Sequence, residues 1–323
     1  MLAQFRSYRK IDRNVLNLVV AESFMQLVNV TFMLLLLIYM HKCGYKDHEG
    51  AHFMKFRFLG VLALAIPIGI YIRNHKIKPL FLFGALAVPL TGIVVILSIK
   101  YHITWLIYAS HLLWGIGFVC IQVTAVPFVL RHAAPESKTE ALSLIHSTWS
   151  LAGITAGIVI FGLEYIFPAY MNEEIVMLIL TGVGLFSFYY AWKIRVDEEV
   201  GDTLMKDESL KLKETSQPSN SHTNTQSQTH TSFNLYHSTF NGYDWGTIAV
   251  AMTPTTMIAI GAGLTVPFIS LFFYKIHGVD SEDFSLLSTA ALIIVAYATL
   301  MVPNVKRSLG YRLAIPFTQS VSI

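Results

Sequence analysis

The sequence predicts an all-α transmembrane protein with eight membrane-spanning helices and the start of a ninth. Apolar residues make up 54% of the 323 residues. Charged residues make up 13%, about half of the roughly 25% that is usual in soluble domains. Several apolar runs also reach the roughly 20 residues that a helix needs to cross a bilayer. A soluble fold would need more charge to coat its surface, so we expect lipid to surround most of the chain.

Eight apolar runs are long enough to span a membrane. They are Asn14 to Met40, Phe56 to Ile72, Pro79 to Ile99, Thr104 to Leu130, Leu142 to Phe167, Ile175 to Trp192, Trp245 to Tyr274 and Phe284 to Val302. A ninth run begins near Leu313 and reaches Ile323, which is too short to cross a bilayer alone.

Basic residues gather in the N-terminal stretch and in every second connection between these runs. Those connections follow the second, fourth, sixth and eighth runs. The connections after the fifth and seventh runs are acidic instead, with Glu173, Glu174 and Asp280 among their residues. Because cytoplasmic loops carry the excess of lysine and arginine, the N-terminus is expected in the cytoplasm. We therefore expect a multi-pass protein of the cell (inner) membrane, and the alternation supports the count of eight.

The domain organisation follows from one long polar connection. Residues 1–195 are expected to form an N-terminal six-helix bundle. Residues 196–243 are rich in Ser, Thr, Asn, Gln and His, a composition that favours a disordered cytoplasmic linker. Residues 244–323 would form a partial second bundle.

Two loops at corresponding positions have related sequences. After the second run, a glycine precedes a basic segment, and the candidate loop residues are Gly69, Arg73, Lys76 and Lys78. After the second run beyond the linker, Pro303 to Arg312 reads P-x-x-x-R-x-x-G-x-R, with Arg307 and Gly310 at its defined positions. A repeat of position and character suggests two related halves.

With six spans, a long loop, further spans and these two loops, the chain resembles the major facilitator superfamily. The resemblance covers nearly the whole chain. It implies two six-helix halves around a central cavity, and secondary active transport of a small solute by alternating access. Arg73 departs from the aspartate that the family has in its first loop. The family also has about twelve spans. A second hypothesis is therefore a non-transporting truncated membrane protein, or a scaffold derived from such a transporter.

Polar side chains inside the first run are candidates for a solute and proton pathway. Glu22, Gln26 and Asn29 follow each other at i, i+4 and i+7 and so share one helix face. An ionisable group in hydrocarbon costs about 2.5 to 3.5 kcal/mol, so it usually faces a cavity or a partner. In the alternative interpretation, Glu22 pairs with a basic residue of a neighbouring helix and the two amides hydrogen-bond between helices.

The fourth and seventh runs supply the remaining candidates. His111 can carry a proton near neutral pH, and Gln122 lies eleven residues further on the same expected face. The alternative for His111 is a neutral ring bonded to a nearby carbonyl. In the seventh run, the pathway candidates are Thr255 and Thr256, and the candidates for a gating bend are Pro254, Gly261 and Gly263. These prolines and glycines could equally serve tight helix packing.

Other classes of function have little support in the sequence. A net charge of +3 does not imply nucleic acid. Walker, G-x-S-x-G and H-E-x-x-H motifs do not occur, so we expect neither an enzyme nor an ATP-driven pump. The histidines lack the tight spacing of a zinc site. The expected partners are a small solute, the lipid bilayer and protons, without a metal or another cofactor.

Overall fold

The computed structural model describes residues 8, 11–195, 246, 253, 256–257, 260–261, 263 and 265–321. All regular secondary structure in these residues is helical. Seven helical segments among them are long and apolar enough to cross a membrane. These segments are Arg13–Lys42, Asp47–Ile72, Lys78–Lys100, Thr104–His132, Pro135–Ile166, Glu173–Trp192 and Ser281–Ser308. The all-α class is therefore confirmed in the described residues, and seven of the eight predicted spans correspond to helices that are long and apolar enough to cross a membrane.

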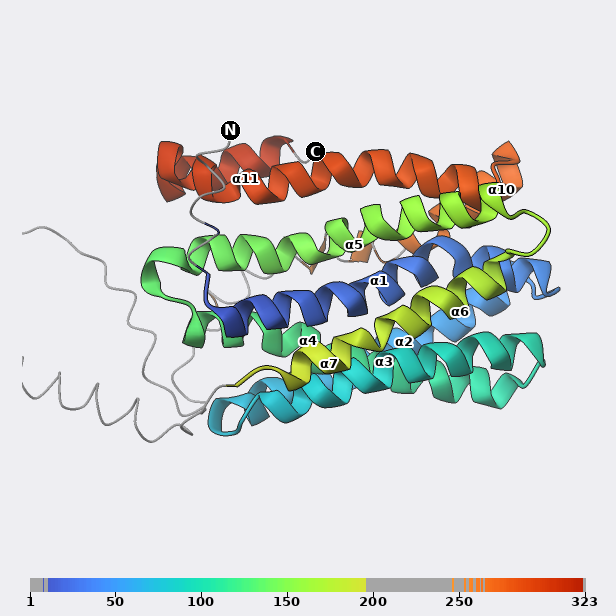
Figure 1. Cartoon of the computed structure of the whole chain (residues 1–323), viewed down its shortest axis with the longest axis horizontal. Helices are drawn as coiled ribbons and strands as arrows, with labels where there is room; N and C mark the ends of the chain where they lie inside the picture. The colour runs from blue at the N-terminus through green and yellow to red at the C-terminus, as the bar shows by residue number, and fades with distance from the viewer. Residues whose placement is uncertain are drawn as a thin grey trace, which may run out of the picture. The chain divides into compact units, whose positions relative to one another are not determined.

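Helix α1 (Arg13–Lys42) is the most enclosed of these segments. Its first turn is capped by Asp12, whose side chain accepts a hydrogen bond of 2.7 Å from the backbone N–H of Asn14. Inside the bundle, 83% of its most apolar stretch is buried. The helix packs against α5, α6 and α7, as Figure 1 shows. Polar side chains in the middle of α1, such as Glu22, Gln26 and Asn29, are consequently buried inside the protein.

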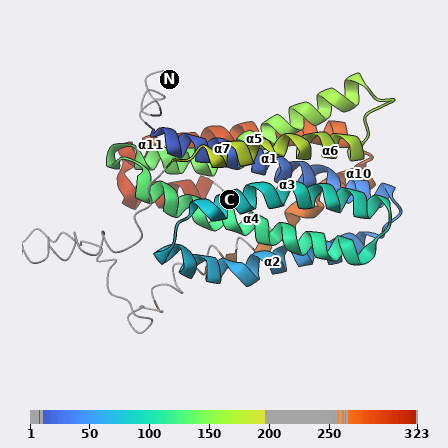
Figure 2. The same cartoon turned by 60° about the horizontal axis from the view of Figure 1, so that its bottom comes forward.

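Helices α2 (Asp47–Asn74) and α3 (Lys78–Lys100) both pack against α4 (Thr104–His132), and Figure 2 shows the three together. The backbones of α2 and α4 approach closely because both helices have a glycine at the crossing. A Cβ atom on Gly60 would clash with the carbonyl of Leu112, and one on Gly115 would clash with the carbonyl of Arg57. Helix α2 also begins nine residues before the predicted Phe56. The predicted span was defined by apolar residues only, and the first turn of α2 contains the acidic residues Asp47 and Glu49. The prediction therefore began too late.

The next span-length segments differ in continuity. Helix α5 (Lys138–Ile166) follows a 3₁₀ turn at Pro135–Ser137 and runs unbroken. The sixth predicted span consists of two helices, α6 (Glu173–Gly184) and α7 (Phe186–Trp192), which meet at Leu185. Asn172 caps α6 by accepting a hydrogen bond of 3.0 Å from the backbone N–H of Ile175.

Helix α11 (Ser281–Val321) lies along α5, as both views of the bundle show. The contact uses the small residues of α5, because a Cβ atom on Gly157 would clash with Thr289 and one on Gly153 with Leu292. The hydroxyl of Ser285 also donates a hydrogen bond of 3.2 Å to the carbonyl of Gly157. Such close approach through small residues is typical of helices that pack within membranes.

Gly310 interrupts α11. Its φ of 68° and ψ of 170° are not helical, and this region of backbone conformation is open almost only to glycine. Two helices therefore meet at Gly310, and the eighth predicted span extends well beyond Val302.

The predicted seventh span, Trp245 to Tyr274, is described only in part. A 3₁₀ turn at Val266–Phe268 contains the buried Pro267 and leads into α10 (Ile269–His277). The predicted linker, residues 196–243, lies outside the described residues. The described residues 268–321 belong to the same compact unit as the described residues up to 195.

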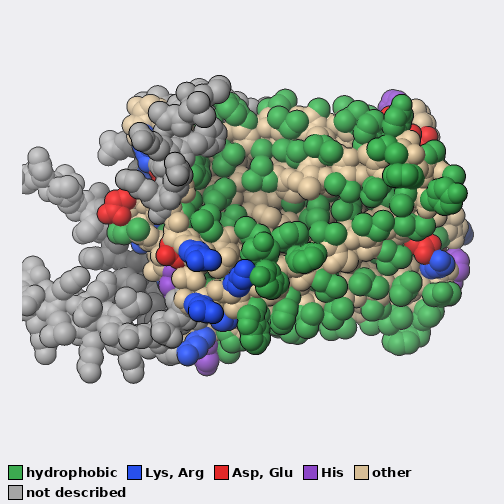
Figure 3. Space-filling view, viewed as in Figure 1, with side chains coloured by type: hydrophobic (Ala, Val, Ile, Leu, Met, Phe, Trp, Pro, Cys, Tyr) green, Lys and Arg blue, Asp and Glu red, His purple; other side chains and the backbone are tan. Residues whose placement is uncertain are grey.

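The surface of the described helices separates apolar from charged side chains. Figure 3 shows hydrophobic side chains over the middle of one face and a group of Lys and Arg side chains at one end. Charged side chains and histidines also occur at the opposite end. This distribution is typical of a helix bundle whose middle is surrounded by lipid.

Candidate functional site

A chain of polar side chains runs along the buried face of α1. Glu22, Gln26 and Asn29 are 4%, 3% and 5% exposed. The Nδ2 group of Asn29 donates a hydrogen bond of 3.0 Å to Oε1 of Gln26. The Nε2 group of Gln26 in turn donates one of 3.4 Å to Oε1 of Gln122 on α4. The predicted common face is thus present, and it is turned towards the neighbouring helices.

Arg57 on α2 extends this chain, although the sequence analysis did not single it out. Its Nη2 group donates a hydrogen bond to Oδ1 of Asn29, and the residue is 4% exposed. Arg57 lies ten residues into α2, about 15 Å along the helix at 1.5 Å per residue. Exposed charged or polar side chains precede it, among them Asp47 and Lys55, whereas Arg57 itself is buried. The ion pairs found among the described residues do not include Arg57.

Aromatic rings enclose the Arg57 guanidinium. Its Cζ atom lies 4.5 Å from the ring centroid of Trp114 and 5.4 Å from that of Phe118, both on α4. Phe32 of α1 packs edge-on against Trp114, with 4.2 Å between the ring centroids. Ring faces attract a cation, most strongly where water is excluded. These contacts offset part of the cost of burying the charge but supply no negative charge.

His111 and Trp114 each bury a nitrogen that has no hydrogen-bond partner within the described part of the chain. The Nδ1 atom of His111 lies 2.8 Å from the carbonyl of Ile107. A carbonyl only accepts, so Nδ1 carries a proton, and Nε2 is the nitrogen without a partner. The indole N–H of Trp114 is an unpaired donor. Buried polar groups in proteins are almost always bonded, so both groups need an explanation.

Glu22 lies at the other end of the polar chain. Its carboxyl group neighbours the side chains of Gln26 and of Thr148 on α5. Its Oε2 atom has no hydrogen-bond partner among the described residues, and no ion pair found there includes it. The predicted alternative, a pair with a basic residue of a neighbouring helix, therefore has no counterpart in the described structure.

The candidates in the first basic loop show no comparable cluster. Lys76 is exposed, and a Cβ atom on Gly69 would meet nothing within 4 Å. The Nζ atom of Lys78 lies 5.9 Å from the ring centroid of Trp192. The Arg73 side chain lies outside the described residues. In the seventh predicted span, Pro254 and Thr255 also lie outside them, and the described ones are exposed, namely Thr256, Gly261 and Gly263.

Arg307 belongs instead to a network that joins α11 to α5. It forms an ion pair with Glu140, whose side chain is 1% exposed. The Ser143 hydroxyl donates a hydrogen bond of 2.6 Å to the carbonyl of Thr299. The Tyr8 hydroxyl donates one of 3.0 Å to the carbonyl of Leu300. Burial raises the pKa of the Tyr8 phenol above its ordinary value. The hydrogen bond with Ser143 lowers this pKa, but its effect is smaller than that of burial.

A second network joins the opposite end of α11 to α1, α5 and α6. The Lys42 ammonium lies 2.5 Å from Oε1 of Glu173. The Ser281 hydroxyl contacts two carboxyl groups, at 2.7 Å from Oε2 of Glu164 and 3.1 Å from Oε1 of Glu173. Both carboxyl groups are buried. Polar groups thus fasten α11 at Ser281 and again between Thr299 and Arg307, with small-residue packing between these two places.

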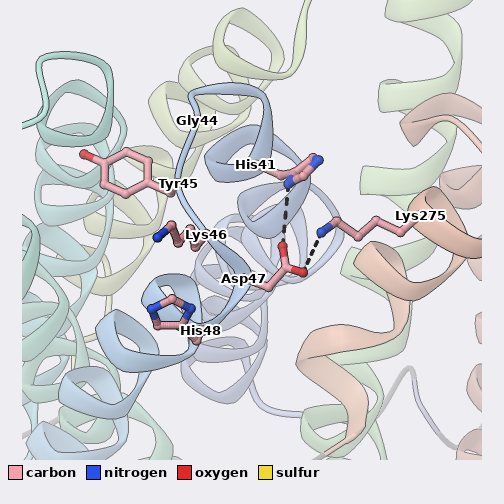
Figure 4. A pocket seen from close by; sticks show the side chains of 7 residues that line it. All are labelled: His41, Gly44, Tyr45, Lys46, Asp47, His48 and Lys275. Carbon is pink, nitrogen blue, oxygen red and sulfur yellow. Dashed lines mark hydrogen bonds and ion pairs between the residues drawn. The ribbon is translucent and has the colours of Figure 1, made fainter.

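An open hollow of about 590 Å³ lies where α1 ends, α2 begins and α10 passes. Figure 4 shows Asp47 between two bases that line it. The Asp47 carboxylate lies 2.5 Å from Nζ of Lys275 and 3.5 Å from Nδ1 of His41. Burial raises the pKa of Tyr45, which also lines the hollow. The hollow lies at the ends of the helices and none of the residues of the buried polar chain line it, so it is a separate site.

Comparisons with known proteins do not assign the chain to a family. Neither the protein-family models nor the curated proteins contain a significant match. Within the described residues, no group of three His, Cys, Asp or Glu side chains could hold a metal ion. The proposals below therefore depend on the sequence and on the geometry of these side chains.

Proposed function

We propose that the chain is a secondary active transporter of a small solute, of the major facilitator type, and that it works by alternating access. The observation that carries this proposal is the buried polar chain from Glu22 through Gln26 and Asn29 to Arg57. Ionisable residues at this depth are costly, and they commonly mark the pathway of a substrate or an ion. A bundle that served only as a scaffold could be held together by apolar and small residues.

Glu22 is the proposed site of the coupled proton. Its carboxyl group is buried, has amide and hydroxyl neighbours rather than a basic partner, and keeps one oxygen unpaired in the described structure. Such a group can gain and lose a proton without breaking an ion pair. Acidic residues in similar surroundings act in the proton relays of other transporters.

The contact between α5 and α11 is the proposed surface on which the two parts of the transporter rock. Gly153 and Gly157 let the two helices lie close together, and polar groups fasten both ends. Opening one set of polar contacts while the other remains closed would expose one side of the membrane at a time. The end rich in Lys and Arg in Figure 3 is the proposed cytoplasmic end, which would also place the N-terminus there.

The test is solute uptake by the purified chain in sealed lipid vesicles, using a library of labelled solutes and an imposed pH gradient. We expect uptake that depends on the gradient. Glu22→Gln should keep exchange of the solute but lose its dependence on the gradient. Glu136→Gln, which neutralises an exposed carboxylate in a connection, is the matched control and should behave as the parent.

Two outcomes would count against the proposal. If Glu22→Gln kept the full pH dependence, the coupling role would be wrong. If no solute entered the vesicles above the rate of empty ones, a non-transporting membrane protein would be the better assignment.

A further inference from the structure

We infer that Arg57 and Trp114 form a binding site for the carboxylate of a small, largely apolar organic acid. The inference builds on the proposed function, because it names the class of solute that the transporter would carry. Two independent observations point to this ligand. One is a buried cation without a described anion, and the other is a buried N–H donor without an acceptor.

The charge of Arg57 is the first observation. Asn29 accepts one hydrogen bond from Nη2, whereas a guanidinium carries five N–H donors in a planar fork. Asn29 is neutral, so the charge stays uncompensated among the described residues. A carboxylate can bind such a fork through two parallel hydrogen bonds. A bound carboxylate would give the buried guanidinium of Arg57 an oppositely charged partner.

The indole of Trp114 is the second observation. The residue is 0% exposed, and its Nε1–H has no acceptor among the described residues. Its ring also lies 4.5 Å from Cζ of Arg57. A buried donor that neighbours a buried cation favours an anionic acceptor that could use both. A metal cation or an amine would be repelled at the same place.

The surroundings define the rest of the ligand. Phe32 and Phe118 add apolar walls next to Trp114 and Arg57. Close backbone contact at Gly60 and Gly115 restricts the space between α2 and α4. These features favour a compact monocarboxylate with an apolar body over inorganic phosphate, which would bring more charge than one arginine can balance.

The test is equilibrium binding of labelled benzoate and butyrate to the full chain in lipid nanodiscs. Benzamide serves as the neutral analogue of benzoate, and inorganic phosphate as the strongly hydrated anion. We expect the two carboxylates to bind, benzoate to protect the chain against thermal unfolding, and benzamide and phosphate to do neither.

The variants separate a ligand site from a structural arginine. Arg57→Met should weaken carboxylate binding at least tenfold. Trp114→Phe keeps a ring but removes the N–H, and should weaken it less. The matched control is Arg131→Met, since the guanidinium of Arg131 donates to the carbonyl of Ile72 elsewhere in the bundle; it should bind as the parent. If Arg57→Met does not fold, Trp114→Phe still decides the question.

The outcomes distinguish this inference from the proposed function. Carboxylate binding without vesicle uptake would retain the site and remove the transport role. Uptake of a neutral or cationic solute by a chain that binds neither carboxylate would retain transport and overturn this site. Equal benzoate affinity in the parent, Arg57→Met and Trp114→Phe would also overturn it.

Discussion

Arg307 on α11 and Glu140 on α5 form an ion pair whose two partners differ sharply in exposure. The Glu140 side chain is 1% exposed, whereas that of Arg307 is 57% exposed. Removal of the arginine would leave a buried carboxylate without its counter-charge, and water would reach only the side where Arg307 lay. The ion pair therefore stabilises the charge of the buried Glu140 more than that of Arg307, which water also solvates.

The first prediction concerns this pair. Arg307→Ala should lower the free energy of unfolding by about 1–3 kcal/mol, less than for a fully enclosed pair because Arg307 is partly solvated. Thermal unfolding in detergent measures the change. Combining it with Glu140→Gln should recover much of the loss, since no buried charge then remains unpaired. Strict additivity of the two changes would show that the residues do not interact.

The second prediction concerns Asn29. Asn29→Leu should destabilise the chain by about 1–3 kcal/mol, because it deprives the buried Arg57 of its hydrogen-bond acceptor. The double change Asn29→Leu with Arg57→Met should be more stable than Asn29→Leu alone. Gln122→Leu is the matched control, as it removes an exposed amide with a long hydrogen bond of 3.4 Å to Gln26. A greater loss in the control would contradict the importance of Arg57.

The third prediction concerns the small residues of α5. Gly157→Leu should separate α5 from α11, because its side chain would occupy the space of Thr289 and the carbonyl of Ser285. Overpacking of this kind costs about 1–3 kcal/mol. Gly162→Leu lies on the same helix, where an added Cβ would meet nothing within 4 Å, and should be tolerated. Thermal unfolding and limited proteolysis of α11 measure the effect in both variants. Equal losses of stability in Gly157→Leu and Gly162→Leu would contradict the close contact at Gly157.

The fourth prediction uses the pH dependence of Tyr8. Burial raises the pKa of its phenol above the ordinary 10.0, so the folded chain holds this proton more tightly than the unfolded one. The resulting stability is complete below pH 10 and is lost as the pH rises through the folded pKa. Tyr8→Phe cannot ionise, so its deficit in melting temperature relative to the parent should shrink above pH 10. A deficit that stayed constant from pH 8 to 11 would refute this account.

The sequence predicted most of the membrane-length helices because the cost of exposing polar atoms to lipid makes long apolar runs easy to recognise. It also predicted the shared face of Glu22, Gln26 and Asn29, since helical spacing alone places them together. The break at Leu185 was missed, because both helices around it are apolar and hydropathy does not report a turn within an apolar run.

Arg57 was missed for a related reason. It is the second residue of the predicted run Phe56 to Ile72, and hydropathy alone does not show whether a charged residue near the start of a run is buried. Contacts with Asn29 on α1 and Trp114 on α4 bury it. The acidic first turn, Asp47 and Glu49, was the available signal, since carboxylates favour helix N-termini. His111 is buried whereas Gln122 is exposed, and eleven residues separate the two by about 16 Å along α4.

The seam between Gly157 and Ser285 also constrains how the chain is made. The two residues are 128 positions apart, and ribosomes add about 5–20 residues each second. The surface of α5 at Gly157 is therefore made roughly 6 to 26 seconds before the part of α11 that packs against it has been synthesised. During this interval, lipid or another helix must cover this surface of α5. The small residues that allow close packing in the finished protein thus also leave the growing chain dependent on lipid or another helix to cover them.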